Sequence, residues 1–137
     1  MGLIHLDAGV VIGLLDGTDA HHASSTRSLA EALRAGHRLA MAASAFAECL
    51  VGPSRRGQRA VDTVDDLFAR LPIEIVPLDA AIARMAAGIR AKHTSMRLPD
   101  TFVIATAALA SADRLVTTDR RWPAARKLGI GTVIDTI

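Results

Sequence analysis

The sequence predicts an α/β fold in which a central parallel sheet is covered by helices on both faces. Two observations lead to this class. Short strand-like runs alternate with longer helical patterns along the 137 residues, which is the order that βαβ units produce. Most of the strand-like runs are also nearly continuous in apolar character, as strands buried on both faces require. The length suits one core, and we expect residues 1–137 to form a single domain.

Five short segments have strand character. In chain order they are Leu3–Leu6, Arg38–Met41, Ile73–Val76, Arg114–Thr117 and Thr132–Ile134. Right-handed crossovers between parallel strands place helices on both faces of the sheet. If the strand order is 3-2-1-4-5, the first and fourth strands are neighbours at the point where the order reverses. Sites in such sheets form outside the carboxyl ends of the strands at that point.

Helical patterns fill the intervals between the strands. They cover residues 9–15, 22–35, 44–51, 56–70, 80–92, 100–111 and 123–128. Local signals mark several of the boundaries. Asp79 precedes the fifth pattern and is a good N-cap, while Pro99 stands at the start of the sixth. Gly17 lies between Asp16 and Asp19 in a turn.

Composition narrows the class of protein. Half of the residues are hydrophobic, which favours a folded globule over disorder. No apolar run approaches the roughly 20 residues that span a bilayer, and we expect neither a membrane segment nor a signal peptide. Cys49, the single cysteine, has no partner for an internal disulfide, which favours a cytoplasmic protein.

Basic residues gather in three places although the net charge is only +2. The clusters are Arg55, Arg56 and Arg59; Arg90, Lys92, His93 and Arg97; and Arg120, Arg121, Arg126 and Lys127. Such clusters suit phosphate contacts of a nucleic-acid-binding protein. Solvated helix faces are the alternative explanation of each cluster taken alone.

Four of the fourteen acidic residues are set apart from the others because they lie in the most apolar parts of the chain. Asp7 and Asp119 follow the first and fourth strands, Glu48 lies in "SAFAECLVG", and Asp100 begins "DTFVIATAALA". Each has a structural alternative, because an Asp can cap a helix or turn and a Glu can reach solvent from a helix. Together they suit Mg²⁺ or Mn²⁺, which bind carboxylate oxygens and activate water and phosphoryl groups.

Other chemistries fit the sequence less well. The phosphate-binding and nucleophile motifs GxxxxGK[ST], GxGxxG and GxSxG are missing. The five histidines show no zinc-ligand spacing with cysteine, and no pair of them is placed to serve a metal-free ribonuclease. A receiver-like phosphoacceptor domain would need an Asp at the end of the third strand and a Lys after the fifth. Asp79 is explained as a cap, and no such Lys follows.

The four acids and their surroundings resemble the PIN-domain nucleases, and within them the VapC-type toxins of bacterial toxin–antitoxin pairs. "HLDAGVVIGLLD", "SAFAECL", "LPDTFVIATAAL" and "RLVTTDRRW" carry the resemblance, which covers nearly the whole chain. It implies a three-layer α/β/α fold and a cytoplasmic, Mg²⁺- or Mn²⁺-dependent endoribonuclease. It also implies an RNA substrate, a homodimer and an inhibiting antitoxin. Carried over by position, Asp7, Glu48, Asp100 and Asp119 would bind the metal and form the catalytic site.

Two alternatives remain open beside the toxin. One is an RNA-processing or DNA-cleaving PIN nuclease without an antitoxin. The other is a non-catalytic module that binds RNA or protein, which the intact acidic set disfavours. The sequence does not identify the RNA.

Residues next to the acids add smaller expectations. Gly9 stands where many relatives carry Ser or Asn, so a supporting hydroxyl or amide is missing there and water is expected to replace it. Thr117 or Thr118 can add a hydroxyl beside the acids. With three Phe and one Trp in the chain, we expect no multi-base stacking platform, and Trp122 is assigned a packing role.

Overall fold

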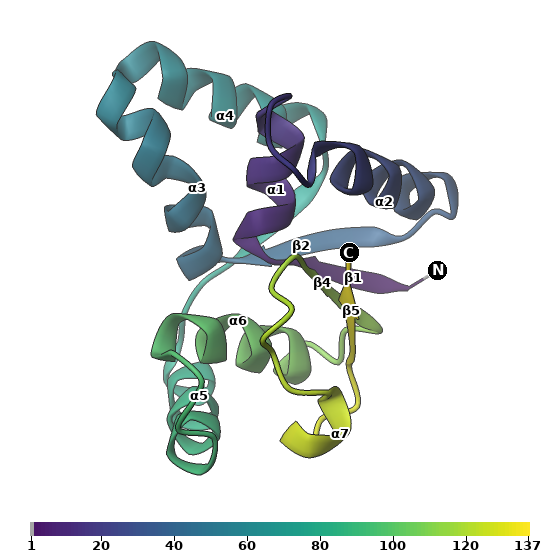
Figure 1. Cartoon of the computed structure of the whole chain (residues 1–137), viewed down its shortest axis with the longest axis vertical. Coiled ribbons are helices and arrows are strands. Elements are labelled where there is room, and N and C mark those ends of the chain that lie inside the picture. The colour runs from purple at the N-terminus through teal and green to yellow at the C-terminus, as the bar shows by residue number, and fades with distance from the viewer. Residues whose placement is uncertain (1) are drawn as a thin grey trace.

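The computed structural model describes residues 2–137 and shows a five-stranded parallel sheet in the order β3-β2-β1-β4-β5. The strands are β1 (Leu3–Leu6), β2 (Arg38–Ala42), β3 (Ile73–Val76), β4 (Arg114–Thr117) and β5 (Val133–Thr136). Helices lie on both sides of this sheet (Figure 1). The predicted three-layer α/β/α fold is confirmed, and the strand order is the one that the sequence analysis assumed.

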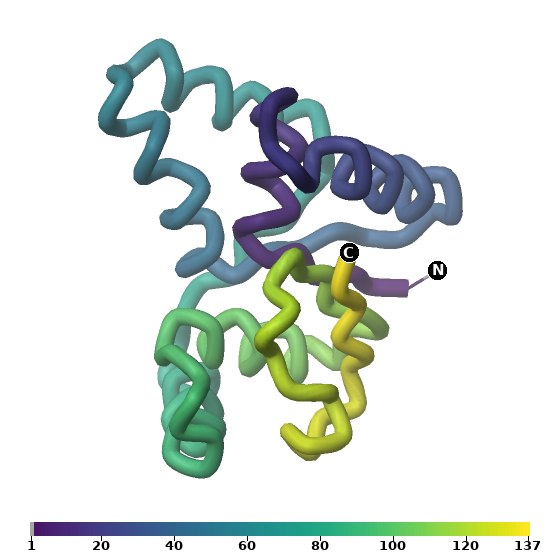
Figure 2. The backbone as a smooth tube through the Cα atoms, in the orientation of Figure 1, coloured from purple at the N-terminus to yellow at the C-terminus, as the bar shows by residue number. Residues whose placement is uncertain are grey.

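Four helices lie on one side of the sheet and three on the other. The first group is α1 (Ala8–Leu15), α2 (His22–Arg34), α3 (Ala43–Arg56) and α4 (Gln58–Arg70). The second group is α5 (Ala80–Lys92), α6 (Leu98–Leu109) and the short α7 (Ala125–Leu128). The tube view in Figure 2 shows the purple-to-teal first half of the chain above the sheet and the green-to-yellow second half mainly below it. None of the helices in residues 2–137 is long and apolar enough to cross a membrane.

The core lies between the central strands and the helices that cover them. Ile4 and Leu6 of β1, Met41 of β2 and Leu115 of β4 are almost completely buried. On the helical side, Ile104 of α6 is fully buried as well. Burying an aliphatic side chain of this size contributes about 1.5–3 kcal/mol, so the apolar runs of the sequence account for the sheet at the centre.

The largest departure from the predicted boundaries is in α3. We expect a helix that stops near residue 51, because Gly52 and Pro53 follow, but α3 continues to Arg56. Pro53 is buried inside the helix, so packing outweighs the one hydrogen bond that its missing N–H removes. The chain turns instead at Gly57, whose φ of 120° is accessible mainly to glycine.

Smaller shifts occur at α6 and β5. Helix α6 begins at Leu98 rather than at residue 100, with Pro99 in its first turn, where a backbone N–H needs no partner inside the helix. Strand β5 runs from Val133 to Thr136 rather than over residues 132–134, because it follows the register of β4, in which Arg114 pairs with Val133. Both shifts leave the predicted order of elements unchanged.

Candidate active site

Asp7 lies at the centre of the carboxyl edge of the sheet, between the end of β1 and the start of α1. Its side chain is buried and caps α1, since Oδ1 accepts a hydrogen bond from the Ala8 N–H at 2.8 Å. The other oxygen, Oδ2, accepts one from Thr117 Oγ1 at 2.8 Å. Burial raises the pKa of Asp7 to about 6 in spite of these two bonds. The cap alternative is therefore correct, but it leaves a buried carboxyl with an incompletely compensated charge.

Asp100 and Glu48 contribute negative charge to the same region. Asp100 lies in the first turn of α6, and Glu48 lies on α3 with much of its side chain exposed. Both charges raise the pKa of Asp7 beyond the effect of burial. The pKa of Glu48 is itself raised, first by partial burial and then by the charge of Asp100. Three acids from three different elements thus interact electrostatically.

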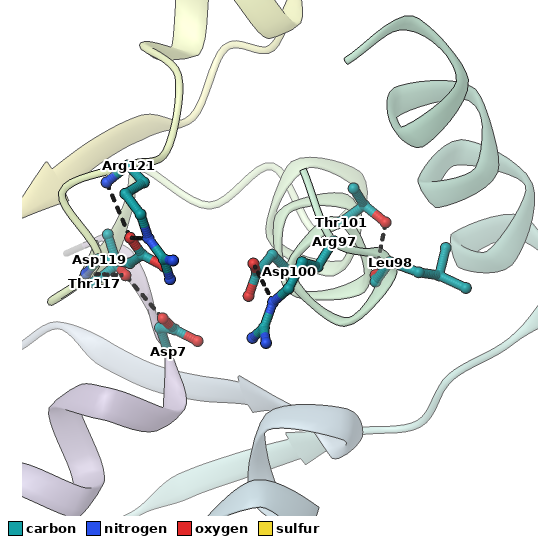
Figure 3. A network of polar contacts seen from close by, with 8 residues as sticks. All are labelled: Asp7, Arg97, Leu98, Asp100, Thr101, Thr117, Asp119 and Arg121. Atoms are coloured by element: carbon teal, nitrogen blue, oxygen red, sulfur yellow. Dashed lines mark hydrogen bonds and ion pairs between the residues drawn. The ribbon is translucent and has the colours of Figure 1, made fainter. Parts of the chain in front are cut away.

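Asp119 reaches the site from the loop after β4. Thr117 connects it to Asp7, because the Thr117 hydroxyl accepts the Asp119 N–H at 3.1 Å while donating to Asp7. Arg121 binds the Asp119 carboxylate with two guanidinium hydrogen bonds of 3.0 Å each. These contacts lower the pKa of Asp119. Figure 3 shows Arg121 beside Asp119 on the same side as Asp7, and Arg97 beside Asp100 opposite them.

The structure brings the four acids to one edge of the sheet but not into one tight cluster. Asp100 and Asp119 line a small recess, whereas Glu48 lines a larger hollow beside α1 and α3. Within residues 2–137, no group of three or more His, Cys, Asp and Glu side chains is arranged to hold a single metal ion. The assignment of Asp7, Glu48, Asp100 and Asp119 as catalytic and metal-binding residues stays a prediction.

Residues 4–128 match the family model of the PIN domain, which is more than half of the chain. The chain belongs to the PIN-domain family. No curated protein sequence matches it significantly.

Solved structures share the fold of this PIN domain at low sequence identity. VapBC2 from Rickettsia felis, bound to a DNA fragment from their promoter, has a TM-score of 0.75 at 16% identity, covering 98% of both chains. VapC20 from Mycobacterium tuberculosis, a Sarcin-Ricin loop cleaving toxin, has a TM-score of 0.69 at 17% identity, covering 86% of this chain and 91% of that one. A toxin–antitoxin complex from Klebsiella pneumoniae has a TM-score of 0.61 at 20% identity, covering 86% and 88%. The predicted likeness to VapC-type PIN proteins is confirmed for the fold.

The side chains of this PIN domain suit a hard divalent cation in their chemistry. The donors at the edge are carboxylate and hydroxyl oxygens, the ligands that Mg²⁺ and Mn²⁺ prefer. Cys49 is close by, but burial raises the pKa of its thiol to about 12, so it stays protonated and is a poor ligand. Mg²⁺ commonly uses only one or two carboxylates and completes its shell with water. A set of acids that is not tightly clustered is compatible with this mode of Mg²⁺ coordination.

The structure also answers the question raised by Gly9. An ideal Cβ atom at Gly9 would overlap Thr118 Oγ1, so the threonine side chain occupies the space that a residue with a side chain would need. The hydroxyl of Thr118 therefore lies beside position 9. Thr117 is the hydroxyl that bonds Asp7, as one of the two expected candidates.

Sequence reasoning did not single out Arg97 and Arg121 as site residues. They belong to two of the basic clusters, but their ion pairs with Asp100 and Asp119 depend on the folded geometry. The sequence did contain a signal for these ion pairs, because each arginine lies two or three residues from one of the four acids.

Proposed function

We propose that this PIN domain is a Mg²⁺- or Mn²⁺-dependent endoribonuclease that hydrolyses RNA phosphodiester bonds at the Asp7 site. The observation that supports the proposal most is the buried Asp7 carboxyl, which has a pKa of about 6 and interacts with Glu48 and Asp100. A buried charge needs a partner, and a divalent cation supplies one. The family membership of the chain supports the same activity.

Each acid has a role that follows from its position. Asp7, held by the Ala8 N–H and the Thr117 hydroxyl, offers a fixed carboxylate to the metal. Asp100 adds a carboxylate from the start of α6, and Glu48 and Asp119 flank the site. A bound Mg²⁺ would lower the pKa of a coordinated water and stabilise charge on the phosphoryl group.

Cleavage of RNA by the purified protein tests this activity. We expect cleavage with Mg²⁺ or Mn²⁺ and none in excess EDTA, measured on total cellular RNA with mapping of the new ends. The mapping also identifies the substrate. Undiminished cleavage in excess chelator would refute the metal mechanism, and cleavage of DNA but not RNA would favour a different PIN nuclease.

We further propose that the protein is the toxin of a toxin–antitoxin pair, acting in the cytoplasm as a homodimer. A hollow of about 390 Å³ that includes Glu48 supports a partner site. It is lined by Ile12 and Leu15 of α1 and by Glu48, Pro53 and Arg56 of α3. An antitoxin helix could lay apolar side chains there and direct an Arg or Lys to the acids. The toxin–antitoxin complex among the solved structures supports this assignment.

A growth assay with co-purification tests the toxin assignment. We expect expression of the chain alone to arrest growth and the product of a neighbouring small gene to relieve the arrest and to co-purify with the protein. Light scattering of the purified protein measures whether it is a dimer. Harmless overexpression of a folded, RNA-cleaving chain would instead favour an RNA-processing nuclease without an antitoxin.

A further inference from the structure

Two arginines lie over the acidic site and pair with two of its four acids. Arg121 binds both oxygens of Asp119, and Arg97 Nε lies 3.6 Å from Asp100 Oδ2. The arginines come from opposite sides of the site, Arg97 from the N-cap of α6 and Arg121 from the loop after β4 (Figure 3). Without a metal, the acids therefore have cations of the protein's own as counterions.

These ion pairs compete with metal binding. A carboxylate oxygen that accepts a guanidinium N–H is less available to a divalent cation, and the bidentate pair of Arg121 occupies both oxygens of Asp119. The arginines are also the more exposed partners. Their side chains are 68% and 80% exposed, against 16% and 20% for those of Asp100 and Asp119. A cation that took the acids would leave the guanidinium groups free to turn outward.

A recess between the two pairs indicates what the released groups would bind. It is lined by both pairs and by Trp122, and its volume is about 60 Å³. Arg97 and Arg121 both line this small recess, so a phosphate group placed at it could contact either guanidinium group. Guanidinium groups bind phosphate oxygens with paired hydrogen bonds.

We propose that Arg97 and Arg121 bind phosphate groups of the nucleic-acid substrate and that the acids hold them as internal counterions until a divalent cation displaces them. The inference rests on the proposed nuclease function. It requires metal and RNA to bind cooperatively, because each ligand breaks the ion pairs that oppose the other. It assigns the two arginines to binding the substrate and leaves metal binding to the acidic side chains of the site.

Metal titration tests whether the arginines compete with the metal for the acids, and it requires no cleavage. Trp122 is the only tryptophan, the chain has no tyrosine, and the indole lines the recess, so its fluorescence reports on the site. We expect Arg121→Gln to bind Mg²⁺ about two- to fivefold more tightly than the wild type, as loss of one exposed ion pair allows. Arg120→Gln removes the same charge from the next residue, which has no ion pair with the acids, and should change Mg²⁺ affinity much less. Calorimetry gives the same affinities independently of the Trp122 fluorescence.

RNA binding tests the second half. A mixed-sequence RNA oligonucleotide is titrated at several salt concentrations with Ca²⁺ in place of Mg²⁺, and its intactness is checked afterwards. Arg97→Gln and Arg121→Gln should each weaken binding and reduce the slope of log affinity against log salt by about 0.7–1, the loss of one phosphate contact. Arg34→Gln, at the end of α2 beside the amino ends of the strands, should leave the slope unchanged.

The outcomes separate this inference from the nuclease proposal. Opposite effects of Arg121→Gln, tighter metal and weaker RNA, support the inference, since a merely structural arginine would weaken both. A wild type that binds Mg²⁺ and cleaves RNA, with metal affinity unchanged in Arg121→Gln, overturns the inference and leaves the nuclease standing. An unchanged salt slope in both arginine variants overturns the phosphate contacts. Absence of any metal binding together with absence of cleavage overturns both proposals.

Discussion

At the scale of single residues, the proposed chemistry depends most on Asp7. Its carboxyl is buried, it caps a helix, and burial raises its pKa from the ordinary value of 3.8 to about 6. A rise of that size corresponds to about 3 kcal/mol of unfavourable free energy for the charged form at neutral pH. Binding of a cation would offset this unfavourable free energy and stabilise the charged Asp7 carboxylate.

Replacing Asp7 should therefore separate activity from stability. We expect Asp7→Asn to abolish RNA cleavage and to raise the unfolding free energy of the metal-free protein at pH 7 by about 1–3 kcal/mol, because the buried charge is gone. The amide oxygen can still accept the Ala8 N–H. Urea unfolding in EDTA and a cleavage assay measure the two effects.

Asp79→Asn is the matched control for that substitution. Asp79 caps α5 by accepting the Ile82 N–H at 2.9 Å, on an element that contributes no acid to the site. Asparagine caps helices about as well, so cleavage and stability should both stay near wild type. A loss of cleavage in Asp79→Asn equal to that in Asp7→Asn would contradict our sorting of the acids.

Thr117 should affect the site indirectly, because its hydroxyl positions Asp7 and Asp119. Thr117→Val deletes the hydroxyl that donates to Asp7 and accepts from the Asp119 backbone. We expect about a 10- to 100-fold loss of Mg²⁺ affinity or of cleavage, as for other residues that orient metal ligands. Trp122 fluorescence and RNA cleavage measure the change. Thr106→Val, which removes a buried hydroxyl that donates to the Phe102 carbonyl, is the control and should retain Mg²⁺ affinity.

At the scale of elements, the extended α3 and the short α1 together form the hollow proposed for a partner. Predicted boundaries would end α3 before Pro53 and Arg56, both of which line the hollow. Local sequence signals failed here because Gly52 and Pro53 usually interrupt helices, while burial of Pro53 against its surroundings favours the continued helix. The hollow is thus a product of packing rather than of local propensity.

A substitution in the hollow should affect the partner and spare the chemistry. Ile12 is 37% exposed and lines the hollow, so Ile12→Asp leaves most of the core intact. We expect this variant to lose most of its affinity for an antitoxin while cleaving RNA normally. Glu48→Gln should weaken the complex only moderately, because the apolar contacts remain. Calorimetry measures the affinity of each variant for the antitoxin. A larger loss of affinity in Glu48→Gln than in Ile12→Asp would contradict a mainly apolar interface.

At the scale of the whole molecule, two buried titratable groups on β1 and its carboxyl end act in opposite directions. His5 is buried in the central strand, neither ring nitrogen has a hydrogen-bond partner within residues 2–137, and burial lowers its pKa from 6.5 to about 4. Its stabilising effect is lost as pH falls from 6.5 toward 4. Asp7 has a raised pKa, so folding gains stability as pH falls from about 6 toward 3.8.

The opposite effects of His5 and Asp7 predict how the unfolding free energy should depend on pH when one of the two residues is replaced. Each group changes the unfolding free energy by about 3 kcal/mol over nearly the same pH range, so their effects almost cancel in the metal-free wild type. Between pH 6.5 and pH 4, we expect the unfolding free energy of Asp7→Asn to fall by about 3 kcal/mol more than that of the wild type. The unfolding free energy of His5→Leu should instead rise over the same range. Urea unfolding in EDTA measures both. Parallel pH profiles in all three proteins would refute this account.

Much of the fold followed from local patterns in the sequence. The apolar strand runs, the caps and the alternation of elements predicted four strand positions within one residue. The position of Asp7 and Asp119 at the carboxyl edge followed from the parallel sheet, because parallel strands end at the same edge. These properties depend on residues close in sequence, whereas the strand order was assumed from the sequence and fixed only by pairing between remote segments.

The tertiary structure decided the features that depend on distances between remote residues. The Thr117–Asp7 hydrogen bond joins residues 110 positions apart, and the raised pKa of Asp7 depends on burial by several elements. The side chains of Arg97 and Arg121, from different segments, meet at one recess only after the sheet has assembled. Electrostatic and hydrogen-bond energies fall steeply with separation. Sequence order therefore identified the charged groups of this protein, while folding determined which of them interact.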